Sequence, residues 1–432
     1  MRLRPLFFAL LACCVAGGTA YLPIAVDAEQ TASGQGQAQG QGQGQGQAQG
    51  QGGASRGRGR SADGAQPLPG QERGALIRRP GADREPQVPL PNIREYKPRS
   101  TLVVPQHPVP RARYPVIDIH SHQPTPVTQE QFDALVTSMD PLNLKILVNS
   151  TGVSGDRLVE SVAAIKANRN RDRMVQMTTI DFRGPIAPGF GEKAAKQLEA
   201  DVKAGAVAVG ELNKNFGLVA KKTDGTLLKL DDPELDPIWE TAARLRIPVF
   251  IHTADPQEFF EPMDFKNERF LELALYPDRR WPAPPNPSFN DLMGQRDRLF
   301  KRHPKTTFIV AHLGWHANDL ARLGKMFDEM PNVHSEVGAV LYDIGRQPRF
   351  AHDWFVKYQD RVLFGKDSWA ADEYLVYFRV LETDDEYFDY YRKRHAFWKM
   401  YGLSLPDEVL KKIYYKNALR IVPGIDAAGF PP

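Results

Sequence analysis

The sequence predicts an α/β protein built around a (β/α)₈ TIM barrel, with a signal segment and a disordered Gly/Gln-rich tether in front of it. From residue 116 onward, eight short β-branched runs alternate with segments of helical periodicity. No glycine-rich phosphate loop follows any of these runs, which counts against an open, doubly wound nucleotide-binding sheet. Histidine and aspartate stand at the ends of several runs, where a barrel of this kind carries its chemistry.

The first residues are typical of an export signal. Arg2 and Arg4 form a positively charged start, and the apolar segment Leu6–Ala16 is too short to span a membrane comfortably. The small residue Ala28 offers a cleavage site, so residues 1–28 are predicted to be a signal peptide. The mature protein is then expected to be periplasmic or secreted.

Both cysteines of the chain, Cys13 and Cys14, lie inside this signal. A form cleaved after Ala28 therefore contains no thiol and no disulfide. The stretch from Leu10 to Cys13 also resembles a bacterial lipobox, and processing there would leave a lipid anchor on Cys13 instead. Simple export is favoured, because the residue before Ala12 is usually smaller or β-branched in a lipobox.

Residues 29–91 are predicted to form a disordered, low-complexity linker. Gly and Gln alternate from Gly34 to Gly53, and a stretch rich in Gly, Pro and Arg follows. Such a composition cannot bury enough apolar surface to offset the entropy that is lost on ordering. Under a second interpretation Arg56, Arg58 and Arg60 bind an anionic surface, but a run of charges is more often simply solvated.

Residues 92–115 lead into the barrel, which is assigned to residues 116–422. Its strands are predicted from the β-branched runs Val116–His120, Lys145–Asn149, Met174–Ile180, Ala206–Leu212, Pro248–His252, Thr307–Ala311, Asn332–Ser335 and Arg361–Gly365. Its helices are predicted from apolar residues at helical spacing in Thr128–Met139, Gly155–Asn168, Glu192–Ala204, Leu235–Leu245, Asn290–Arg302, Asn318–Met330, Phe350–Tyr358 and Ala371–Leu381. Several of these helices have Asn, Asp or Thr near the start as plausible caps.

The segment Asp255–Phe289 is an insertion in the barrel, dense in Phe, Trp, Tyr and Pro and too long for an ordinary loop between strand and helix. It is either a lid or substrate wall above the catalytic face, or a surface excursion packed by its own aromatic residues. The chain from Glu382 onward has two further helical patterns and is expected to pack on the outside or base of the barrel. Residues 423–432 form a C-terminal tail.

Four histidines and one aspartate fall at the C-terminal ends of predicted strands. His120 and His122 end the first strand, and residues i and i+2 of a strand share a face, so their imidazoles point into the same volume. His252 ends the fifth strand, His312 follows the sixth and Asp367 follows the eighth. Because these strand ends meet at one face of a barrel, we predict a shared metal site.

The residue types explain which metal and which chemistry are expected. Three imidazoles and one carboxylate suit Zn²⁺, Mn²⁺ or Fe²⁺, and Zn²⁺ is the expected ion. An ion with an open position lowers the pKa of bound water to roughly 7. Asp367 would bind the ion and also take the proton of the attacking water. His312 would either complete the ligand set or stand just outside it, where it polarises the substrate or passes a proton.

The remaining histidines are interpreted as structural. They lie before the barrel, in helical patterns, in a turn or inside the seventh strand, at His107, His303, His334, His352 and His395. His316 differs, because it follows His312 closely enough to reach the rim of the site.

Five motifs resemble those of the amidohydrolase superfamily: Asp-Ile-His-Ser-His, Ile-His-Thr, Val-Ala-His-Leu-Gly-Trp, Leu-Phe-Gly-Lys-Asp and Lys-Asn-Ala-Leu-Arg-Ile-Val. They are most similar to the amidohydrolase-related branch, which also holds the aminocarboxymuconate-semialdehyde decarboxylase type of enzyme. Each motif is weak alone, but the five occur in order from Val116 to Val422 and so cover the whole predicted barrel.

The resemblance implies a metal-dependent barrel in which His120, His122, His252 and Asp367 are metal ligands. In decarboxylase-like members of the branch the sixth-strand histidine, here His312, is a catalytic acid or base beside a single metal. In two-metal hydrolases the same histidine binds the second ion.

Two positions depart from the family pattern. Where two-metal relatives carry a carboxylated lysine at the end of the fourth strand, this chain has Glu211, with Lys214 three residues further on. Glu211 would either bridge two ions or form a polar wall of the pocket, and one ion is favoured over two. Lys366 stands where the family usually has Thr or Ser, and as a neighbour on the strand it should point away from Asp367.

Three functions are compatible with these residues. The favoured one is metal-dependent hydrolysis, in which metal-activated water attacks an ester, lactone or amide carbonyl of a small molecule. The second is non-oxidative decarboxylation of an aromatic or enoic acid by a carboxy-lyase. The third is a non-catalytic, exported binding protein, against which the intact ligand set argues. A net charge of +3 gives no indication of a nucleic acid partner, and a homodimer is compatible with the sequence.

Overall fold

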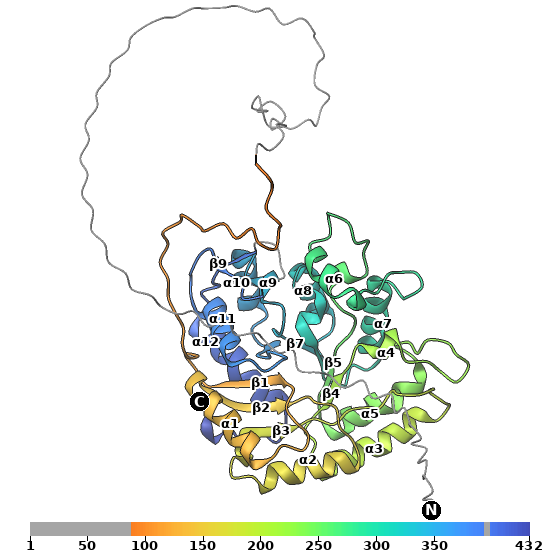
Figure 1. Cartoon of the computed structure of the whole chain (residues 1–432). Coiled ribbons are helices and arrows are strands. Elements are labelled where there is room, and N and C mark those ends of the chain that lie inside the picture. Colours follow the sequence, from red (N-terminus) through yellow and green to blue (C-terminus); the bar gives the residue numbers. More distant parts are fainter. Residues whose placement is uncertain (1–87, 393–397) are drawn as a thin grey trace, which may run out of the picture. The chain divides into compact units, whose positions relative to one another are not determined.

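The computed structural model describes residues 88–392 and 398–432. The predicted signal peptide with Cys13 and Ala28, nearly all of the predicted linker, and His395 lie outside the described residues. The segment before the barrel, drawn in orange in Figure 1, has six exposed large apolar side chains, at Val88, Leu90, Ile93, Tyr96, Leu102 and Val103.

Eight parallel strands form the barrel that the sequence predicts (Figure 1). Three are hydrogen-bonded in the order β1 (Val116–Ser121), β2 (Leu144–Asn149) and β3 (Met174–Gln176). Five more follow in the order β4 (Val209–Leu212), β5 (Val249–Ile251), β6 (Phe308–Val310), β7 (Val333–Glu336) and β8 (Val362–Leu363). Almost all strand residues are buried, as expected for parallel strands that are covered on both faces.

Backbone hydrogen bonds at two places join these groups of strands into a ring. After β3, the Thr178 N–H donates to the carbonyl of Ala208 at 2.9 Å. Between the last strand and the first, Ser121 pairs with Asp367, and the Asp367 N–H donates to the carbonyl of His120 at 2.7 Å. The closure of the barrel therefore brings two of the predicted metal ligands side by side.

Long helices alternate with the strands, at the positions that the sequence predicts. They are α1 (Gln129–Met139), α2 (Asp156–Ala167), α3 (Phe190–Ala204), α5 (Asp236–Leu245), α7 (Phe289–Arg302), α8 (Leu320–Glu329), α10 (Pro348–Lys357) and α11 (Ala371–Glu382). Helices α1 and α7 begin with capping boxes, in which Thr128 pairs with Gln131 and Ser288 with Asp291.

Shorter elements lie between and after these units. The short helices are α4 (Asn215–Leu218), α6 (Phe270–Leu275), α9 (Leu341–Ile344), α12 (Asp407–Lys411) and α13 (Asn417–Ile421), and a π-helical turn η8 (Lys412–Lys416) lies between the last two. Single 3₁₀ turns are η2 (Asp140–Leu142), η3 (Arg171–Arg173), η4 (Pro233–Leu235), η5 (Gln257–Phe259), η6 (Pro277–Arg279), η7 (Ala311–Trp315) and η9 (Ala427–Gly429). Strands β9 (Phe388–Asp389) and β10 (Lys399–Met400) form an antiparallel pair.

The chain after α11 packs against the barrel, as expected. The Phe364 N–H, just after β8, donates to the carbonyl of Ile413 at 2.8 Å, so the π-helical turn is joined to the end of the last strand. Tyr414 is fully buried there, and its hydroxyl donates to the carboxylate of Glu382 at 2.8 Å. This segment therefore packs against the barrel beside β8 and β1.

The insertion after β5 contains η5, α6 and η6 and is anchored to the strand end that it follows. The Trp281 indole N–H donates to the buried carboxylate of Asp255 at 2.7 Å, and the Trp281 backbone N–H donates to Phe259. Lys214, which follows β4, contacts the same Asp255 oxygen at 2.6 Å. The insertion is thus tied to two strand ends on the face that carries the predicted site.

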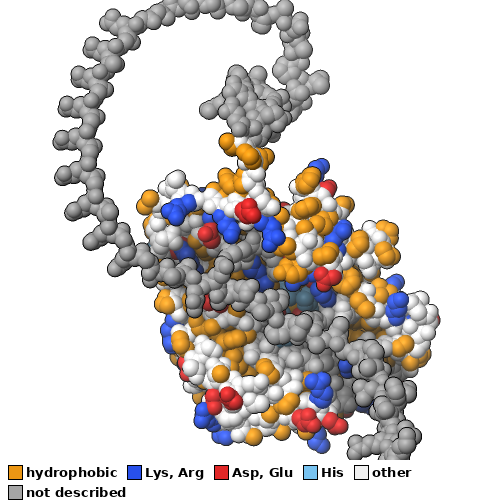
Figure 2. Space-filling model, viewed as in Figure 1, with side chains coloured by type: hydrophobic (Ala, Val, Ile, Leu, Met, Phe, Trp, Pro, Cys, Tyr) orange, Lys and Arg blue, Asp and Glu red, His pale blue; other side chains and the backbone are white. Residues whose placement is uncertain are grey.

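Charged side chains of both signs are scattered over the face of the molecule that Figure 2 shows, without one continuous patch of either sign. This distribution agrees with the small net charge of +3. In the part of the chain that the structure describes, no helix has the length and apolar character that crossing a membrane would require.

Candidate metal centre

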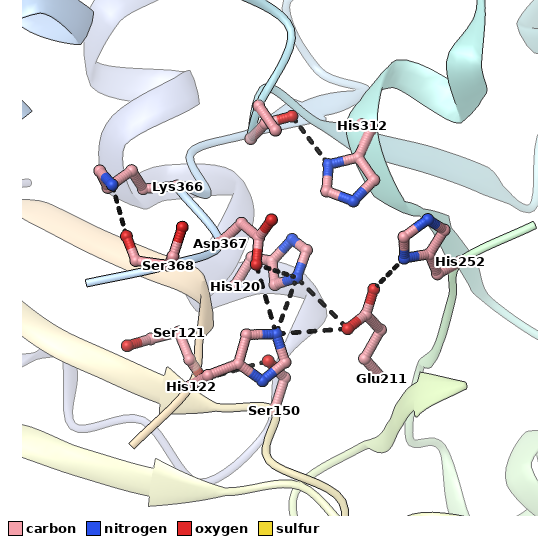
Figure 3. A network of polar contacts seen from close by, with 12 residues as sticks. His120, Ser121, His122, Ser150, Glu211, His252, His312, Lys366, Asp367 and Ser368 are labelled. Carbon is pink, nitrogen blue, oxygen red and sulfur yellow. Dashed lines mark hydrogen bonds and ion pairs between the residues drawn. The ribbon is translucent and has the colours of Figure 1, made fainter. Parts of the chain in front are cut away.

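The first strand supplies two histidines that face one point, as its alternation predicts. The Nε2 atoms of His120 and His122 lie 3.3 Å apart (Figure 3). His120 is fully buried, whereas His122 is about a third exposed. The pair therefore forms one wall of the site, with His122 nearer to the opening.

Two carboxylates complete this group of polar atoms. Oε2 of Glu211, at the end of β4, lies 3.6 Å from Nε2 of His120 and 3.3 Å from Nε2 of His122. Oδ1 of Asp367, just after β8, lies 3.8 Å and 3.5 Å from the same two nitrogen atoms. We call these four residues, His120, His122, Glu211 and Asp367, the ligand cage.

The spacing of the ligand cage fits a divalent metal ion. Ligands of a tetrahedral ion with bonds of about 2.1 Å lie roughly 3.4 Å from one another. The five measured separations of 3.3 to 3.8 Å span this value. Two imidazoles and two carboxylates are also a donor set that Zn²⁺ and Mn²⁺ accept.

His252, predicted as a metal ligand, lies beside the ligand cage. Its Nδ1 is 2.5 Å from Oε1 of Glu211, which is a hydrogen-bond distance. Its Nε2 is buried and has no hydrogen-bond partner among the described residues. Glu211, His252 and His312 form a second group of close ligand atoms that shares Glu211 with the cage.

His312 is held by two backbone contacts next to the cage. It has a left-handed conformation, with a φ of 59°, and its N–H donates to Oε1 of Glu336 at 2.6 Å. Its Nδ1 is 2.8 Å from the carbonyl of Gly338, so Nδ1 carries the proton and Nε2 has the free lone pair. Trp315 lies against the ring, with centroids 4.5 Å apart, and fixes its orientation.

Glu336, at the end of β7, is a site residue that the sequence analysis missed. Its Oε1 lies 3.2 Å from Nδ1 of His120, and its other oxygen accepts from the N–H of Gly338. It thus orients His120 from behind and also fixes the loop that holds His312. Its position could have identified it, because Glu336 stands at the end of the seventh strand and the other site residues also stand at or just after strand ends.

The charges of the site explain why it suits a cation. Burial would lower the pKa of His120, but the carboxylates of Glu211 and Glu336 raise it well above its usual value. Burial would raise the pKa of Glu211, yet the neighbouring His120 and His252 hold it well below its usual value. The carboxylates therefore stay ionised, and a divalent ion can replace the proton on His120 as their partner.

His312 has the opposite electrostatic character. Burial, together with the positive charge that His252 can carry, lowers the pKa of His312 to about 4. The ring is therefore neutral at neutral pH and offers Nε2 as a hydrogen-bond acceptor.

Other residues considered from the sequence lie away from the cage. The Lys366 side chain points away from Asp367, as expected, and its ammonium donates to the carbonyl of Ser368 (Figure 3) and contacts the carboxylate of Glu373. His316 is buried, and its Nε2 lies 3.2 Å from a nitrogen of the buried Arg296.

Comparisons with known proteins agree with this architecture. The family model described as Amidohydrolase matches residues 110–424. No curated protein matches the sequence.

Solved structures of barrel proteins are similar to the chain at low identity. An uncharacterized TIM-barrel protein from Bordetella bronchiseptica is 16% identical, with 71% of this chain and 97% of that one covered and a TM-score of 0.43. A proposed amidohydrolase from Staphylococcus aureus is 18% identical, with 71% of this chain and 99% of that one covered and a TM-score of 0.43. A manganese-bound 5-carboxyvanillate decarboxylase from Novosphingobium aromaticivorans is 16% identical, with 71% of this chain and 96% of that one covered and a TM-score of 0.43. Because the family model spans the whole barrel, the chain belongs to the amidohydrolase family.

Proposed function

We propose that the protein is a metal-dependent carboxy-lyase that removes CO₂ from an aromatic or enoic acid without oxidation. The observation that carries the proposal is the composition of the ligand cage. Three of its residues, His120, His122 and Asp367, have their ligand atoms grouped around one position, and His312 lies next to them with a free Nε2. In the family branch that the sequence resembles, a sixth-strand histidine beside a single metal is the arrangement of the decarboxylases. The cage therefore moves the preference from hydrolysis, which the sequence favoured, to decarboxylation.

The cage residues and His312 have separate roles in this proposal. A divalent ion held by the ligand cage would supply Lewis-acid polarisation of a substrate oxygen. The bond between the substrate carbon and its carboxylate breaks, CO₂ leaves, and the carbon takes a proton that water supplies through the free oxygen of the Asp367 carboxylate. The Asp367 side chain is about a third exposed and can regain its proton from water. Nε2 of His312 accepts a hydrogen bond from a substrate hydroxyl and so orients the acid.

Hydrolysis is the second candidate, and the exposure of the site supports it. Both His122 and Asp367 are about a third exposed, so water has access to the carboxylate of Asp367. In that reaction Asp367 takes a proton from the water that attacks an ester, lactone or amide carbonyl. The same residues thus serve either reaction, and the products distinguish them.

The test is a product assay with the full-length chain, loaded with Zn²⁺ or Mn²⁺ and with its metal content measured. Hydroxybenzoates, enoic acids, esters and lactones are incubated with the protein, and CO₂ release is compared with acid release. We expect one ion per chain and CO₂ from at least one acid, with turnover lost in Asp367→Asn. Acid release from esters or lactones alone would replace this proposal with the hydrolase. Absence of bound metal would overturn both.

The proposal includes export by the N-terminal segment and a small-molecule substrate. N-terminal sequencing of the mature protein tests the first part, with a start at Glu29 expected for cleavage after Ala28. A lipid-modified N-terminal Cys13 would replace simple export with anchoring.

A further inference from the structure

A second cavity lies at the opposite end of the barrel from the ligand cage. It has a volume of about 250 Å³ and is lined by residues that precede or begin β5, β6 and β7, among them Pro248, Thr307 and His334. His252 and His312 follow the C-terminal ends of two of these strands, so the strands separate the two sites. The cavity is far larger than the roughly 30 Å³ that one water molecule occupies. We call it the basal cavity.

Three positively charged side chains line the basal cavity: Arg246, Lys305 and Arg420. No Asp or Glu is among its lining residues. Arg246 and Lys305 form no ion pair with any described residue, and the hydrogen bonds of Arg420 go to a backbone carbonyl and an amide oxygen. Three cations around one concave surface without a carboxylate produce a focused positive potential.

His334 adds a buried polar group to this wall. It is 6% exposed, and its Nδ1 has no hydrogen-bond partner among the described residues. A buried nitrogen of this kind costs free energy unless a ligand or water satisfies it. Exposed cations alone would be explained by solvation, but a buried, unpartnered histidine beside them is not.

The backbone beside Arg246 opposes an anion in the cavity only in part. Arg246 caps the C-terminus of α5, where free carbonyl groups would repel a negative charge. The carbonyls of Ala242 and Ala243, which line the cavity, accept the N–H of Arg246, so their lone pairs are partly used.

We propose that the basal cavity is a binding site for a phosphate group, held by Arg246, Lys305 and Arg420, with His334 at its inner wall. Guanidinium and ammonium groups donate to phosphate oxygens, and the hydroxyl of Thr307 is a further lining donor. The site is independent of the ligand cage and of the reaction that occurs there.

Calorimetric titration of the metal-loaded, full-length chain tests this site, with inorganic phosphate and glycerol phosphate as separate probes at constant ionic strength. We expect saturable binding, and the probe that binds more tightly identifies the source of the phosphate group. The double variant Arg246→Gln with Lys305→Gln should bind at least about tenfold more weakly, because each substitution removes a charge-assisted contact. Both residues are exposed, so the variant is expected to keep the unfolding temperature of the parent protein in phosphate-free buffer.

Arg244→Gln is the matched control. Arg244 is also an exposed cation near the end of α5, but it pairs with Glu199 and does not line the cavity. Its phosphate affinity should equal that of the parent protein. Equal affinity in the double variant, or an equal loss in the control, would overturn the proposal. Binding at the metal centre cannot produce the expected pattern, because every variant retains the ligand cage.

Discussion

At the scale of single residues, the site depends on how each imidazole is oriented. His120, His252 and His312 each direct Nδ1 at an oxygen atom, in Glu336, Glu211 and the backbone of Gly338 respectively. Such contacts select the tautomer and the ring angle of a metal-site histidine. The residues behind the cage should therefore matter nearly as much as the cage itself.

Glu336→Gln is predicted to weaken metal binding by about 10- to 100-fold, because the amide is a poorer partner for Nδ1 of His120. Competition with a chelating dye measures the affinity. Glu329→Gln is the control, since Glu329 at the end of α8 forms an exposed ion pair with Lys301 of α7 and is not part of the site. An unchanged affinity in the Glu336 variant would show that His120 does not need this partner.

His334 makes a pH-dependent contribution to stability. Burial, with the nearby guanidinium groups of Arg361 and Arg420, lowers the pKa of His334 to about 3. The unfolded chain, with a histidine pKa near 6.5, binds this proton more readily than the folded chain. Its contribution is therefore complete above about pH 6.5 and is lost progressively as the pH falls toward 3.

The free energy of unfolding of the parent protein, relative to that of the variant His334→Gln, is accordingly predicted to be higher at pH 7 than at pH 5. Urea unfolding of both proteins at the two pH values measures the free energies. A relative free energy that does not fall between pH 7 and pH 5 would contradict the assigned direction.

At the scale of elements, the seam between β1 and β8 is fixed by the buried carboxylate of Asp118. One oxygen accepts the N–H of His120 at 2.9 Å and of Lys366 at 3.2 Å. The other accepts the hydroxyl of Tyr374 at 2.6 Å. This one side chain thus holds together the two strands that present His120 and Asp367 to the cage.

Asp118→Ala is predicted to lower the free energy of unfolding by about 1–3 kcal/mol, because it leaves buried donors without a partner. Tyr374→Phe removes only one of these hydrogen bonds and should cost less. Chemical denaturation checks both, and metal content should fall in the Asp118 variant. An equal loss of unfolding free energy in the two variants would argue against the hydrogen bonds of Asp118 to His120 and Lys366 as a source of stability.

The insertion after β5 is anchored through Asp255, and we propose that it forms a wall of the substrate pocket, so a change there should alter this wall and leave the barrel intact. Trp281→Phe removes the indole hydrogen bond to Asp255. We expect KM for the substrate to rise more than kcat falls, with an unchanged unfolding temperature. Phe265→Ala, at a side chain that is 98% exposed in the same insertion, is the control. A fall in kcat with unchanged KM would place the contact in the chemical step instead.

At the scale of the whole molecule, the first and last strands of the barrel meet at the metal centre. His120 lies in β1 and Asp367 lies just after β8, and the backbone hydrogen bond between them closes the ring. Ionised carboxylates of Glu211, Glu336 and Asp367 meet at this junction. A bound cation should therefore stabilise the entire fold.

Removal of the metal by a chelator is predicted to lower the unfolding temperature, and addition of Zn²⁺ or Mn²⁺ should restore it. The stabilisation should grow with the logarithm of the free metal concentration, because the ion binds the folded chain only. Differential scanning calorimetry measures the effect. Asp367→Asn, which removes one cage charge, should show a smaller response, and an identical response would contradict its place in the cage.

The sequence by itself determined the barrel and most of the cage. Strand and helix periodicities are local, so they place His120, His122, His252, His312 and Asp367 at strand ends, and a parallel barrel gathers such ends at one face. That Nδ1 of His252 lies within hydrogen-bond distance of Glu211 was shown only by the tertiary structure. So were the partnership of Glu336 with His120 and the basal cavity around His334. These contacts join residues far apart in the chain, and their distances depend on how side chains pack after the ring has closed.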